Sequence, residues 1–401
     1  MTDSVARAYV VGTCDTKSEE LRYVRDLLRR AGVPALLVDV GIRSADGAAD
    51  IGPGEIATMH PDGAATIIEE RDRGKAVVAM SEAFRLFVRD RKDIGGMIGL
   101  GGSGGTAIIA PALRALPIGT PKILVSTVAS GNVRPYVGAS DICMLYPITD
   151  ILGINSISAP VLANAAHALA GMMQHRRAPA PTDKIAVGFT MFGVTTAVVS
   201  QVVAVLRDEY DCLVFHATGI GGESMEALVD AGRIRAVIDL TTTEICDLLM
   251  GGVQPADPDR LGAIARTRVP YVGSCGALDM VNFGAMSKVP VLYRDRRLHA
   301  HNAQVTLMRT TPEENERMGE WIGAKLNACE GPVRFLLPLG GVSAIDIPGG
   351  PFHYPEADAA LFAALRRSVM QTENRQLLEL PHHINDPAFA AAVVAHFRAI
   401  C

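Results

Sequence analysis

Hydrophobic residues in the first half of the chain form short continuous runs that alternate with longer segments of helical periodicity. The runs are mainly apolar and end in glycine-rich or polar turns, as strands buried on both faces of a parallel sheet do. Strands are expected at 8–11, 35–40, 96–100 and 122–126, with a shorter candidate at 142–145. Helices are expected at 18–31, within 63–91 as one or two segments, and at 159–175. The pattern predicts a parallel α/β domain.

A polar break rich in proline and alanine, RRAPAPTD at 176–183, separates two such halves. Beyond it we expect strands at 184–189, 212–216, 235–240, 269–272, 289–292, 305–308 and 333–337. Helices are expected at 197–208, 224–231, 312–328, 357–372 and 387–400. The sequence therefore predicts an α/β fold of two Rossmann-like subdomains with mainly parallel sheets. The predicted bounds are an N-terminal domain at 1–177, a short linker at 178–183 and a C-terminal domain at 184–401.

Composition and charge exclude several classes of protein. The net charge of −5 argues against a basic nucleic-acid-binding surface. The seven cysteines are too dispersed for a CxxC pair, and the N-terminus lacks the features of a signal peptide, so we expect a reduced, cytoplasmic protein. Two long uncharged stretches are broken by glycines or polar residues, so no membrane association is expected. The 39 glycines, about one residue in ten, come in clusters, which are the first candidates for function.

The most informative cluster is GLGGSGGTAII at 99–109, between an expected strand and a helix. Glycines let backbone N–H groups approach a phosphate or carboxylate, and a helix N-terminus adds partial positive charge. The alternative is a tight turn without a ligand, because no lysine follows the glycines as in a Walker A motif. The candidate ligand-binding residues here are Gly101, Gly102, Ser103, Gly104, Gly105 and Thr106.

A second cluster, VGTCDTKSEE from residue 11, also lies where a strand leads into a helix. Open α/β sheets bind ligands beyond the carboxyl ends of their strands. Asp15 and Thr16 would line such a crevice or cap the helix expected from Ser18. Lys17 would lie close to a bound anion, unless it is simply solvated. The candidates from this turn are Gly12, Thr13, Asp15, Thr16 and Lys17.

Three consecutive strand ends in the second half are also polar: FTMFGVTT at 189–196, HATGIGGES at 216–224 and DLTTTE at 239–244. Each alone is typical of a helix N-cap, but together they mark one edge of a sheet. The candidate ligand contacts are Gly193, Thr195, Thr218, Gly219 and Thr243. We expect them to face the same cleft as the N-terminal clusters, with the ligand between the domains.

Catalytic candidates are His216, Cys275 and His301, as acid–base groups or a nucleophile, although each is as readily explained as a structural residue. His299 and His301 have the spacing of a small metal site on a strand, but no carboxylate or cysteine stands at matching spacing, and no metal site is predicted. Asp15 and Asp279 are the candidate ligands of a nucleotide-bound magnesium ion. No motif for hydride, phosphoryl or acyl transfer is complete, so whether the protein is an enzyme stays open.

Several longer segments resemble a known family. They are VGTCDTKSEE, GLGGSGGT, SGNVRPYVGASDI, HATGIGGESME, HNAQVTLMRTTPEEN and LPLGGVSAIDIPGGPFHYPEAD. With them the chain resembles, over nearly its whole length, the uncharacterised bacterial, fungal and plant family that includes the ATP-binding N-terminal domain of the tobamovirus-resistance protein of tomato.

The resemblance implies two Rossmann-like subdomains, ATP as the ligand and a homodimer. The plant protein inhibits viral replication proteins and continues into a TIM-barrel-like part, which this chain lacks, so a separate partner protein with such a barrel is a further expectation. The leading hypothesis is an ATP-binding protein, with magnesium as a companion ion. The alternatives are a metabolic enzyme acting on a small carboxylate or sugar acid, and a ligand-regulated interaction protein.

Overall fold

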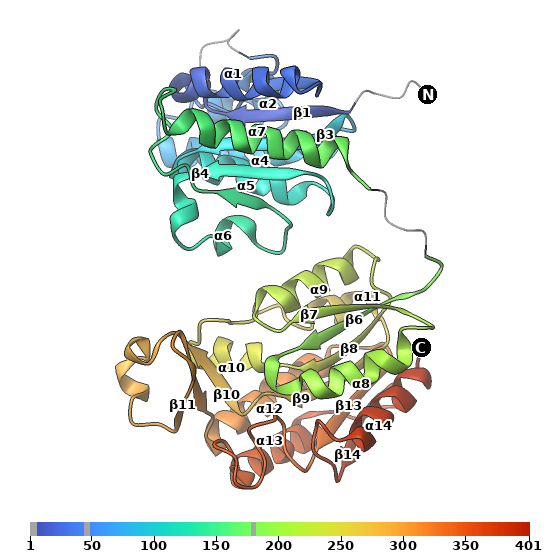
Figure 1. Ribbon diagram of the computed structural model, residues 1–401. Helices are drawn as coiled ribbons and strands as arrows, with labels where there is room; N and C mark the ends of the chain where they lie inside the picture. Colours follow the sequence, from blue (N-terminus) through green and yellow to red (C-terminus); the bar gives the residue numbers. More distant parts are fainter. Residues whose placement is uncertain (1–5, 44–48, 178–181) are drawn as a thin grey trace. The chain divides into compact units, whose positions relative to one another are not determined.

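The computed structural model describes residues 6–43, 49–177 and 182–401 (Figure 1). The chain divides into two compact units, Met1–Ala180 and Pro181–Cys401, and each is described on its own. Residues 178–181 of the predicted linker lie outside the described residues, so the bounds of the linker stay a prediction.

The N-terminal unit is built on a five-stranded sheet in which every pairing is parallel. Its strands are β1 (Arg7–Gly12), β2 (Ala35–Asp39), β3 (Ile94–Gly101), β4 (Lys122–Ser126) and β5 (Cys143–Leu145). Their order across the sheet is β2-β1-β3-β4-β5. The direction of the chain across the sheet reverses between β1 and β3, which is the point where such sheets bind ligands.

Helices cover both faces of this sheet. Side chains on β1 alternate between the faces: Val10 packs in one cluster with Leu21, and Tyr9 packs in another with Phe84. The first face is covered by α1 (Cys14–Arg30) and α7 (Ser158–Gln174), the second by α4 (Arg73–Asp90) and α5 (Ser103–Ala115). Shorter elements are α2 (Pro53–Ala57), α3 (Ala65–Ile68), η1 (Thr127–Ser130) and α6 (Arg134–Val137). The unit is a three-layer α/β/α domain, as predicted.

The C-terminal unit repeats this topology with one more strand. Its main sheet is parallel throughout and has the order β14-β13-β9-β8-β6-β7. The strands are β6 (Ala186–Met191), β7 (Asp211–His216), β8 (Ala236–Thr241), β9 (Tyr271–Gly276), β13 (Val333–Pro338) and β14 (Arg375–Leu380). Numbered within the unit, the order is 2-1-3-4-5-6, so the two units share a strand order in their first five strands.

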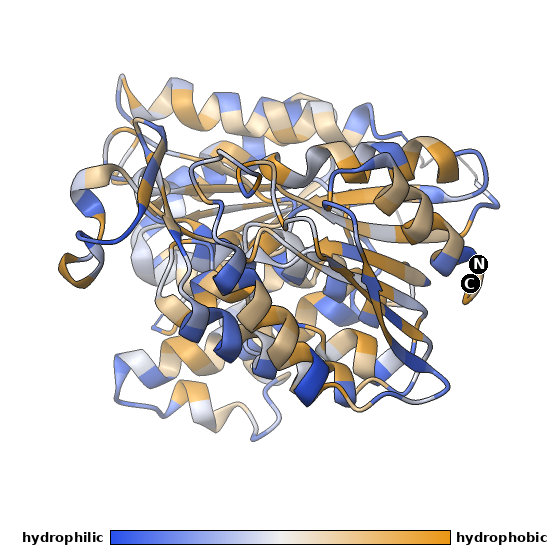
Figure 2. Ribbon diagram, turned by 90° about the horizontal axis from the view of Figure 1, so that it is seen from below, coloured by the Kyte–Doolittle hydropathy of each residue, from blue (hydrophilic) through white to orange (hydrophobic). Residues whose placement is uncertain are grey.

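Helices again lie on both faces of the C-terminal sheet. One face is covered by α8 (Thr196–Leu206) and α14 (Pro387–Arg398). The other is covered by α9 (Ile220–Asp230), α10 (Thr243–Met250), α11 (Gly262–Thr267), α12 (Pro312–Asn327) and α13 (Pro355–Ser368). Figure 2 shows the strands mostly in hydrophobic colours, whereas the helices carry both hydrophobic and hydrophilic positions along their length. This distribution fits sheets buried between amphipathic helices.

A small antiparallel sheet is added to the C-terminal unit, in the order β10-β12-β11 (Figure 1). Its strands are β10 (Met280–Phe283), β11 (Leu298–Asn302) and β12 (Val305–Arg309). The strand expected at 289–292 is wrong: this segment lies between two short helices, η3 (Met286–Lys288) and η4 (Val291–Tyr293). Pro290 has no N–H for a sheet ladder, and Val291 and Leu292 are exposed, so their apolarity does not reflect a buried strand.

Two further differences lie at the C-terminal edge of the main sheet. β14 is absent from the predicted strands, because its sequence, RQLLEL, mixes leucines with charged and polar residues. An edge strand tolerates such residues. The helix expected to reach residue 372 ends at Ser368, and the chain then turns into this strand.

Candidate functional site

A pocket of about 460 Å³ opens in the N-terminal unit where β1 and β3 lead into α1 and α5. It is lined by Thr13, Asp15, Thr16, Lys17, Ile42, Arg43, Arg73, Val77, Gly102, Ser103, Gly104, Gly105, Ile108 and Asp150. The two N-terminal clusters singled out in the sequence therefore meet in one cavity. They meet because β1 and β3 are neighbours at the switch point, where the helices that follow diverge to opposite faces of the sheet.

Three of the lining glycines are not required by the fold. None of Gly102, Gly104 and Gly105 has a positive φ. A Cβ atom at Gly104 would meet no protein atom within 4 Å, and at Gly102 or Gly105 the nearest atoms would be 3.8 and 3.7 Å away. Neither backbone conformation nor packing explains these glycines, so their flat surface remains available for close approach of a ligand.

Two helix N-termini point into this pocket. α5 begins at Ser103 after Gly102, which has no side chain to cap it, and the first hydrogen bond of the helix runs from the Thr106 N–H to the Gly102 carbonyl. The N–H groups of residues 103–105 therefore lack a partner within the helix. The first turn of α1 also lines the pocket, with Asp15 and Thr16. Partial positive charge from both helix ends favours a bound anion.

The charged side chains of the pocket include three cations and two carboxylates. Lys17, Arg43 and Arg73 provide the positive charge, and Asp15 and Asp150 the negative charge. The Lys17 ammonium donates to the Ile151 carbonyl at 2.7 Å, which holds it at the wall of the pocket. The apolar part of the lining comes from Ile42, Val77 and Ile108.

Three other predicted residues support the turns instead of lining the pocket. A Cβ atom at Gly12 would lie 2.8 Å from the Leu21 side chain, so glycine is needed there for α1 to pack on β1. A Cβ atom at Gly101 would lie 2.9 Å from the Thr106 nitrogen. The Thr106 hydroxyl is fully buried and lies 2.6 Å from the Ser126 hydroxyl, which links α5 to the end of β4.

The capping role considered for Asp15 and Thr16 is wrong. α1 begins at Cys14, directly after the strand, and Thr13 occupies the N-cap position. Asp15 and Thr16 therefore belong to a short first turn, and a kink at Lys17, where φ is −136°, separates this turn from the helix that continues from Ser18 as predicted. The Thr16 hydroxyl lies 2.8 Å from that of Thr13. This early start leaves both residues on the wall of the pocket.

Sequence reasoning missed Arg43, Arg73 and Asp150. Arg43 follows the carboxyl end of β2, next to β1 in the sheet, so the strand-end rule would have found it. Arg73 is the first residue of α4, and Asp150 lies in the loop after β5. Tertiary packing brings these two to the pocket, and no local signal marks them.

In the C-terminal unit the glycine-rich turn at 219–222 is already filled by a carboxylate. Glu244 Oε1 accepts hydrogen bonds from the Gly219 N–H at 2.7 Å and the Gly222 N–H at 3.1 Å. A Cβ atom at Gly222 would collide with this same carboxylate. The turn thus has the anion-binding geometry expected of it, but its occupant is a side chain of the protein.

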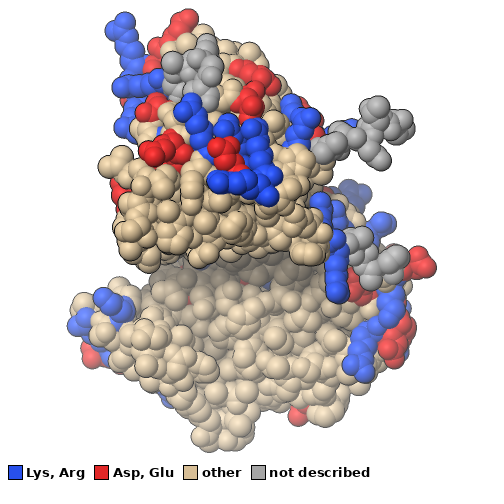
Figure 3. Space-filling model, turned by 45° about the horizontal axis from the view of Figure 1, so that its top comes forward, with Lys and Arg blue, Asp and Glu red and all other residues tan. Residues whose placement is uncertain are grey.

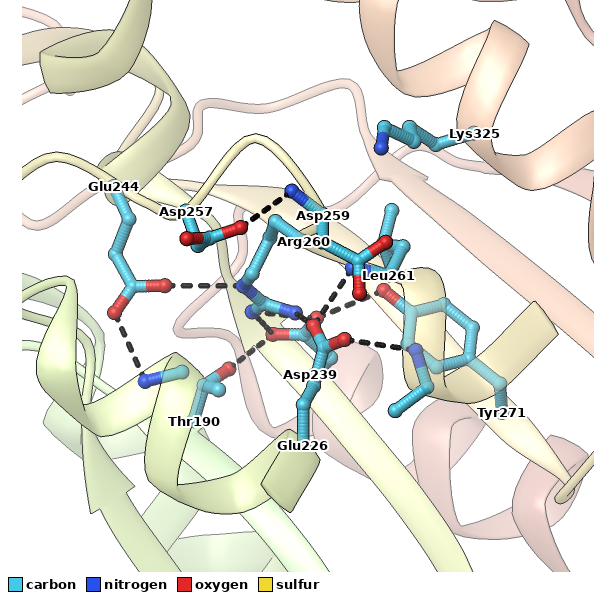
Figure 4. Close-up of polar contacts among 12 residues, drawn as sticks. Thr190, Glu226, Asp239, Glu244, Asp257, Asp259, Arg260, Leu261, Tyr271 and Lys325 are labelled. Carbon is cyan, nitrogen blue, oxygen red and sulfur yellow. Dashed lines mark hydrogen bonds and ion pairs between the residues drawn. The ribbon is translucent and has the colours of Figure 1, made fainter. Parts of the chain in front are cut away.

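The Glu244 carboxylate belongs to a buried network centred on Arg260 (Figure 4). The Arg260 guanidinium donates to Glu244 at 3.0 Å, to Glu226 at 2.8 Å and to Asp239 at 2.9 Å. Tyr271 also donates to Asp239, at 3.0 Å. Burial alone would lower the pKa of Arg260, but the surrounding carboxylates raise it well above its usual value. Burial raises the pKa of Glu244.

The C-terminal threonine candidates are hydrogen-bonded within the unit. The buried hydroxyls of Thr195 and Thr241 lie 2.8 Å apart, and the Thr243 hydroxyl donates to the Met280 carbonyl at 3.3 Å. The Thr218 hydroxyl donates to the His216 carbonyl, also at 3.3 Å. Gly193 is exposed. Whether any of them contacts a ligand stays a prediction.

The three catalytic candidates lie on separate strands. Cys275 is fully buried on β9, and burial raises the pKa of its thiol far above the usual value, which disfavours a thiolate nucleophile. His216 is exposed at the end of β7 and stacks on Phe192, with ring centroids 5.2 Å apart. His301 is exposed on β11 of the small sheet. Within the described ranges, no three His, Cys, Asp or Glu side chains are grouped so that they could hold a metal ion.

The visible face of the N-terminal unit carries side chains of both charges, intermixed (Figure 3). No helix among the described residues combines the length and the apolarity that crossing a bilayer requires.

Comparison with known proteins identifies relatives of nearly full length. A UPF0261 protein of Rhizobium meliloti is 54% identical, over 98% of this chain and 99% of the relative. A UPF0261 protein of Clostridium tetani is 44% identical, over 96% of both chains. The tomato protein described as ToMV resistance protein Tm-1 is 41% identical over 98% of this chain, which corresponds to 56% of the tomato protein.

Family models match both units. The model described as the N-terminal domain of an uncharacterised protein family, UPF0261, matches residues 6–178. The model of the C-terminal domain of the same family matches residues 184–401. The chain therefore belongs to the UPF0261 family, which also matches the resemblance seen in its sequence motifs.

Proposed function

We propose that the N-terminal unit binds a nucleotide, ATP, in the pocket between α1 and α5. The observation that carries the proposal is the wall formed by Gly102, Gly104 and Gly105, where neither the fold nor the packing requires glycine. Such a wall, at a helix N-terminus and beyond the carboxyl end of β3, suits a chain of phosphates that accepts hydrogen bonds from backbone N–H groups.

The rest of the lining favours a nucleotide over a simple anion. A pocket of about 460 Å³ is within the range of small-molecule sites and larger than one phosphate needs. Lys17, Arg43 and Arg73 would neutralise a polyphosphate, and the apolar side chains of Ile42 and Val77 would contact a base. The resemblance described above implies ATP as this nucleotide.

Magnesium would have two carboxylates within this pocket, those of Asp15 and Asp150. Hard oxygen ligands of this kind suit Mg²⁺ bound together with phosphates, where the ion neutralises their negative charge. Asp279, the other candidate from the sequence, is fully buried in the C-terminal unit and does not line this pocket.

Two further expectations belong to the same proposal: a homodimer and a separate partner protein with a TIM-barrel fold. The second rests on the tomato relative, of which the match with this chain covers 56%.

Isothermal titration calorimetry of the full chain with ATP, ADP and adenosine, each with and without magnesium, tests the proposal. We expect saturable binding of ATP, weaker binding of ADP and much weaker binding of adenosine, because the glycine wall and the cations contact phosphates. The proposal fails if neither ATP nor ADP gives heat under any of these conditions, or if adenosine binds as tightly as ATP.

A further inference from the structure

The β5–α7 loop, residues 146–157, belongs both to the nucleotide pocket and to the surface of the N-terminal unit. Asp150 lines the pocket. Ile148 and Leu152, two positions before and after it, have exposed fractions of 64% and 76%. A movement of the loop at the pocket would therefore also move two exposed apolar side chains.

Two polar side chains of α1 hold the middle of this loop. The Lys17 ammonium donates to the Ile151 carbonyl at 2.7 Å, and Glu20 Oε1 accepts from the Gly153 N–H at 2.5 Å. The Ile151 side chain is buried in the same apolar cluster as Leu21 of α1. The loop is therefore joined to the helix that forms one part of the pocket lining.

Glu20 is a carboxylate at a buried helix position. It is 2% exposed, and the other buried residues of α1 are Cys14, Leu21, Val24 and Leu28. Burying a carboxylate costs free energy unless it accepts hydrogen bonds. The hydrogen bond from the Gly153 N–H is therefore the reason that we assign to a carboxylate at this position.

The segment just before these anchors is held mainly by local contacts. The Thr149 N–H donates to the Pro147 carbonyl at 2.8 Å, and the Leu152 N–H to the Asp150 carbonyl at 3.0 Å. Ile148 has a φ of 68°, a left-handed conformation that is strained for a β-branched residue. Such strain persists only where the surrounding structure holds the chain in place. The position of this segment therefore depends on the anchors that follow it.

Lys17 can contact a phosphate without releasing the loop. An ammonium group has three N–H donors, and the Ile151 carbonyl accepts one of them. Lys17 also lines the pocket, so its other donors are available to phosphate oxygens there. A phosphate bound to this ammonium would restrain the same group that holds the loop. Asp150 would add a second link, through a magnesium ion bound together with the phosphates.

We propose that the Lys17 ammonium bridges a nucleotide phosphate and the Ile151 carbonyl, so that nucleotide binding fixes the β5–α7 loop. Glu20 is the positioning residue that keeps this loop within reach of Lys17. The inference rests on the proposed nucleotide site and adds a response outside the pocket: the exposed side chains of Ile148 and Leu152 become fixed when phosphates bind.

Hydrogen–deuterium exchange of the full chain, measured by mass spectrometry, tests the proposal. We expect amide exchange in residues 148–153 to slow at least about fivefold with saturating ATP and magnesium, and to change less than about twofold with adenosine, which has no phosphate. Calorimetry on the same samples shows whether ATP binds. Bound ATP with unchanged exchange in the loop overturns this inference and leaves the nucleotide site standing, whereas absence of ATP binding refutes both.

Lys17→Met tests the bridge, because methionine keeps a long side chain but has no donor. We expect ATP affinity to fall about tenfold and the slowing of exchange in the loop to be lost even at saturation. The control is Lys92→Met: Lys92 is exposed and precedes β3, at the opposite end of the strand from the pocket, and the variant should respond like the wild type. Slowing retained in Lys17→Met overturns the bridge.

Glu20→Met and Glu20→Gln test the positioning role. Methionine fills the buried position without an acceptor, so the slowing with ATP should be lost, whereas glutamine keeps an acceptor oxygen for the Gly153 N–H and should restore it. Equal responses of the two variants overturn the role of Glu20. The comparisons at Lys17 and Glu20 are independent, so either one decides if a variant of the other fails to fold or to bind ATP.

Discussion

At the scale of single residues, glycines of one motif serve two different purposes. Gly101 is needed inside the protein, because a Cβ atom there would press on the backbone of the turn. Gly102, Gly104 and Gly105 line the pocket, and a Cβ atom there would lie no closer than 3.7 Å to a protein atom. The sequence shows them as one cluster, and only the three-dimensional surroundings separate the packing role from the ligand-binding role.

Gly104→Val tests this distinction. The new side chain would occupy the space assigned to the phosphates, and its Cβ atom would meet no protein atom within 4 Å, so we expect an intact fold and ATP affinity reduced at least about tenfold, or about 1.4 kcal/mol. Calorimetry gives the affinity, and thermal unfolding without ligand gives the stability.

The matched control is Gly171→Val. Gly171 also lies in a helix of the N-terminal unit, has no positive φ, and a Cβ atom there would likewise meet nothing within 4 Å, but it does not line the pocket. Its ATP affinity should match that of the wild type. Equal affinities of the two variants would show that the glycine wall does not contact the nucleotide.

At the scale of elements, Arg260 holds together three parts of the C-terminal unit. Its partners Glu226, Asp239 and Glu244 come from α9, β8 and α10, respectively. The Arg260 side chain is 2% exposed, so removing the guanidinium would leave buried carboxylates without compensation. The network also holds the Glu244 carboxylate against the N–H groups of the glycine-rich turn at 219–222. The conformation of this turn therefore depends on the same ion pairs that hold α9, β8 and α10 together.

Arg260→Met is expected to lower the free energy of unfolding of the C-terminal unit by about 3–5 kcal/mol. Arg266→Met provides the comparison: Arg266 also bridges two carboxylates, those of Asp230 and Asp259, but its side chain is 51% exposed, so a loss of at most about 1 kcal/mol is expected. Denaturant unfolding followed by circular dichroism measures both values. Equal losses would contradict the structural role given to Arg260.

The elements also show what the sequence can predict. Mainly apolar strands, such as β3 and β8, are predicted correctly because burial on both faces leaves a clear run of apolar residues in the sequence. β14 is not predicted, because it is an edge strand that contains polar residues. The strand prediction at 289–292 is wrong, because apolar residues that are exposed give the same sequence pattern as a buried strand. In the pocket, Thr13 and the segments 15–17 and 102–105 are predicted from strand ends, whereas Arg73 and Asp150 reach it only through tertiary packing.

At the scale of the whole molecule, one topology is used in two ways. In the N-terminal unit the switch point between β1 and β3 opens into a pocket lined by glycine and cations. The corresponding strands of the C-terminal unit are β6 and β8, and there Thr195 and Thr241 are buried and hydrogen-bonded to each other. The account therefore predicts one nucleotide for each chain, bound by the N-terminal unit.

A crystal structure of the full chain with ATP and magnesium tests this central claim most directly. We expect one nucleotide per chain, with phosphate oxygens within hydrogen-bond distance of the backbone nitrogens of residues 103–105, the Lys17 side chain beside them, and no nucleotide at the C-terminal turn filled by Glu244. A nucleotide bound elsewhere, with the glycine wall free of phosphate, would contradict the account.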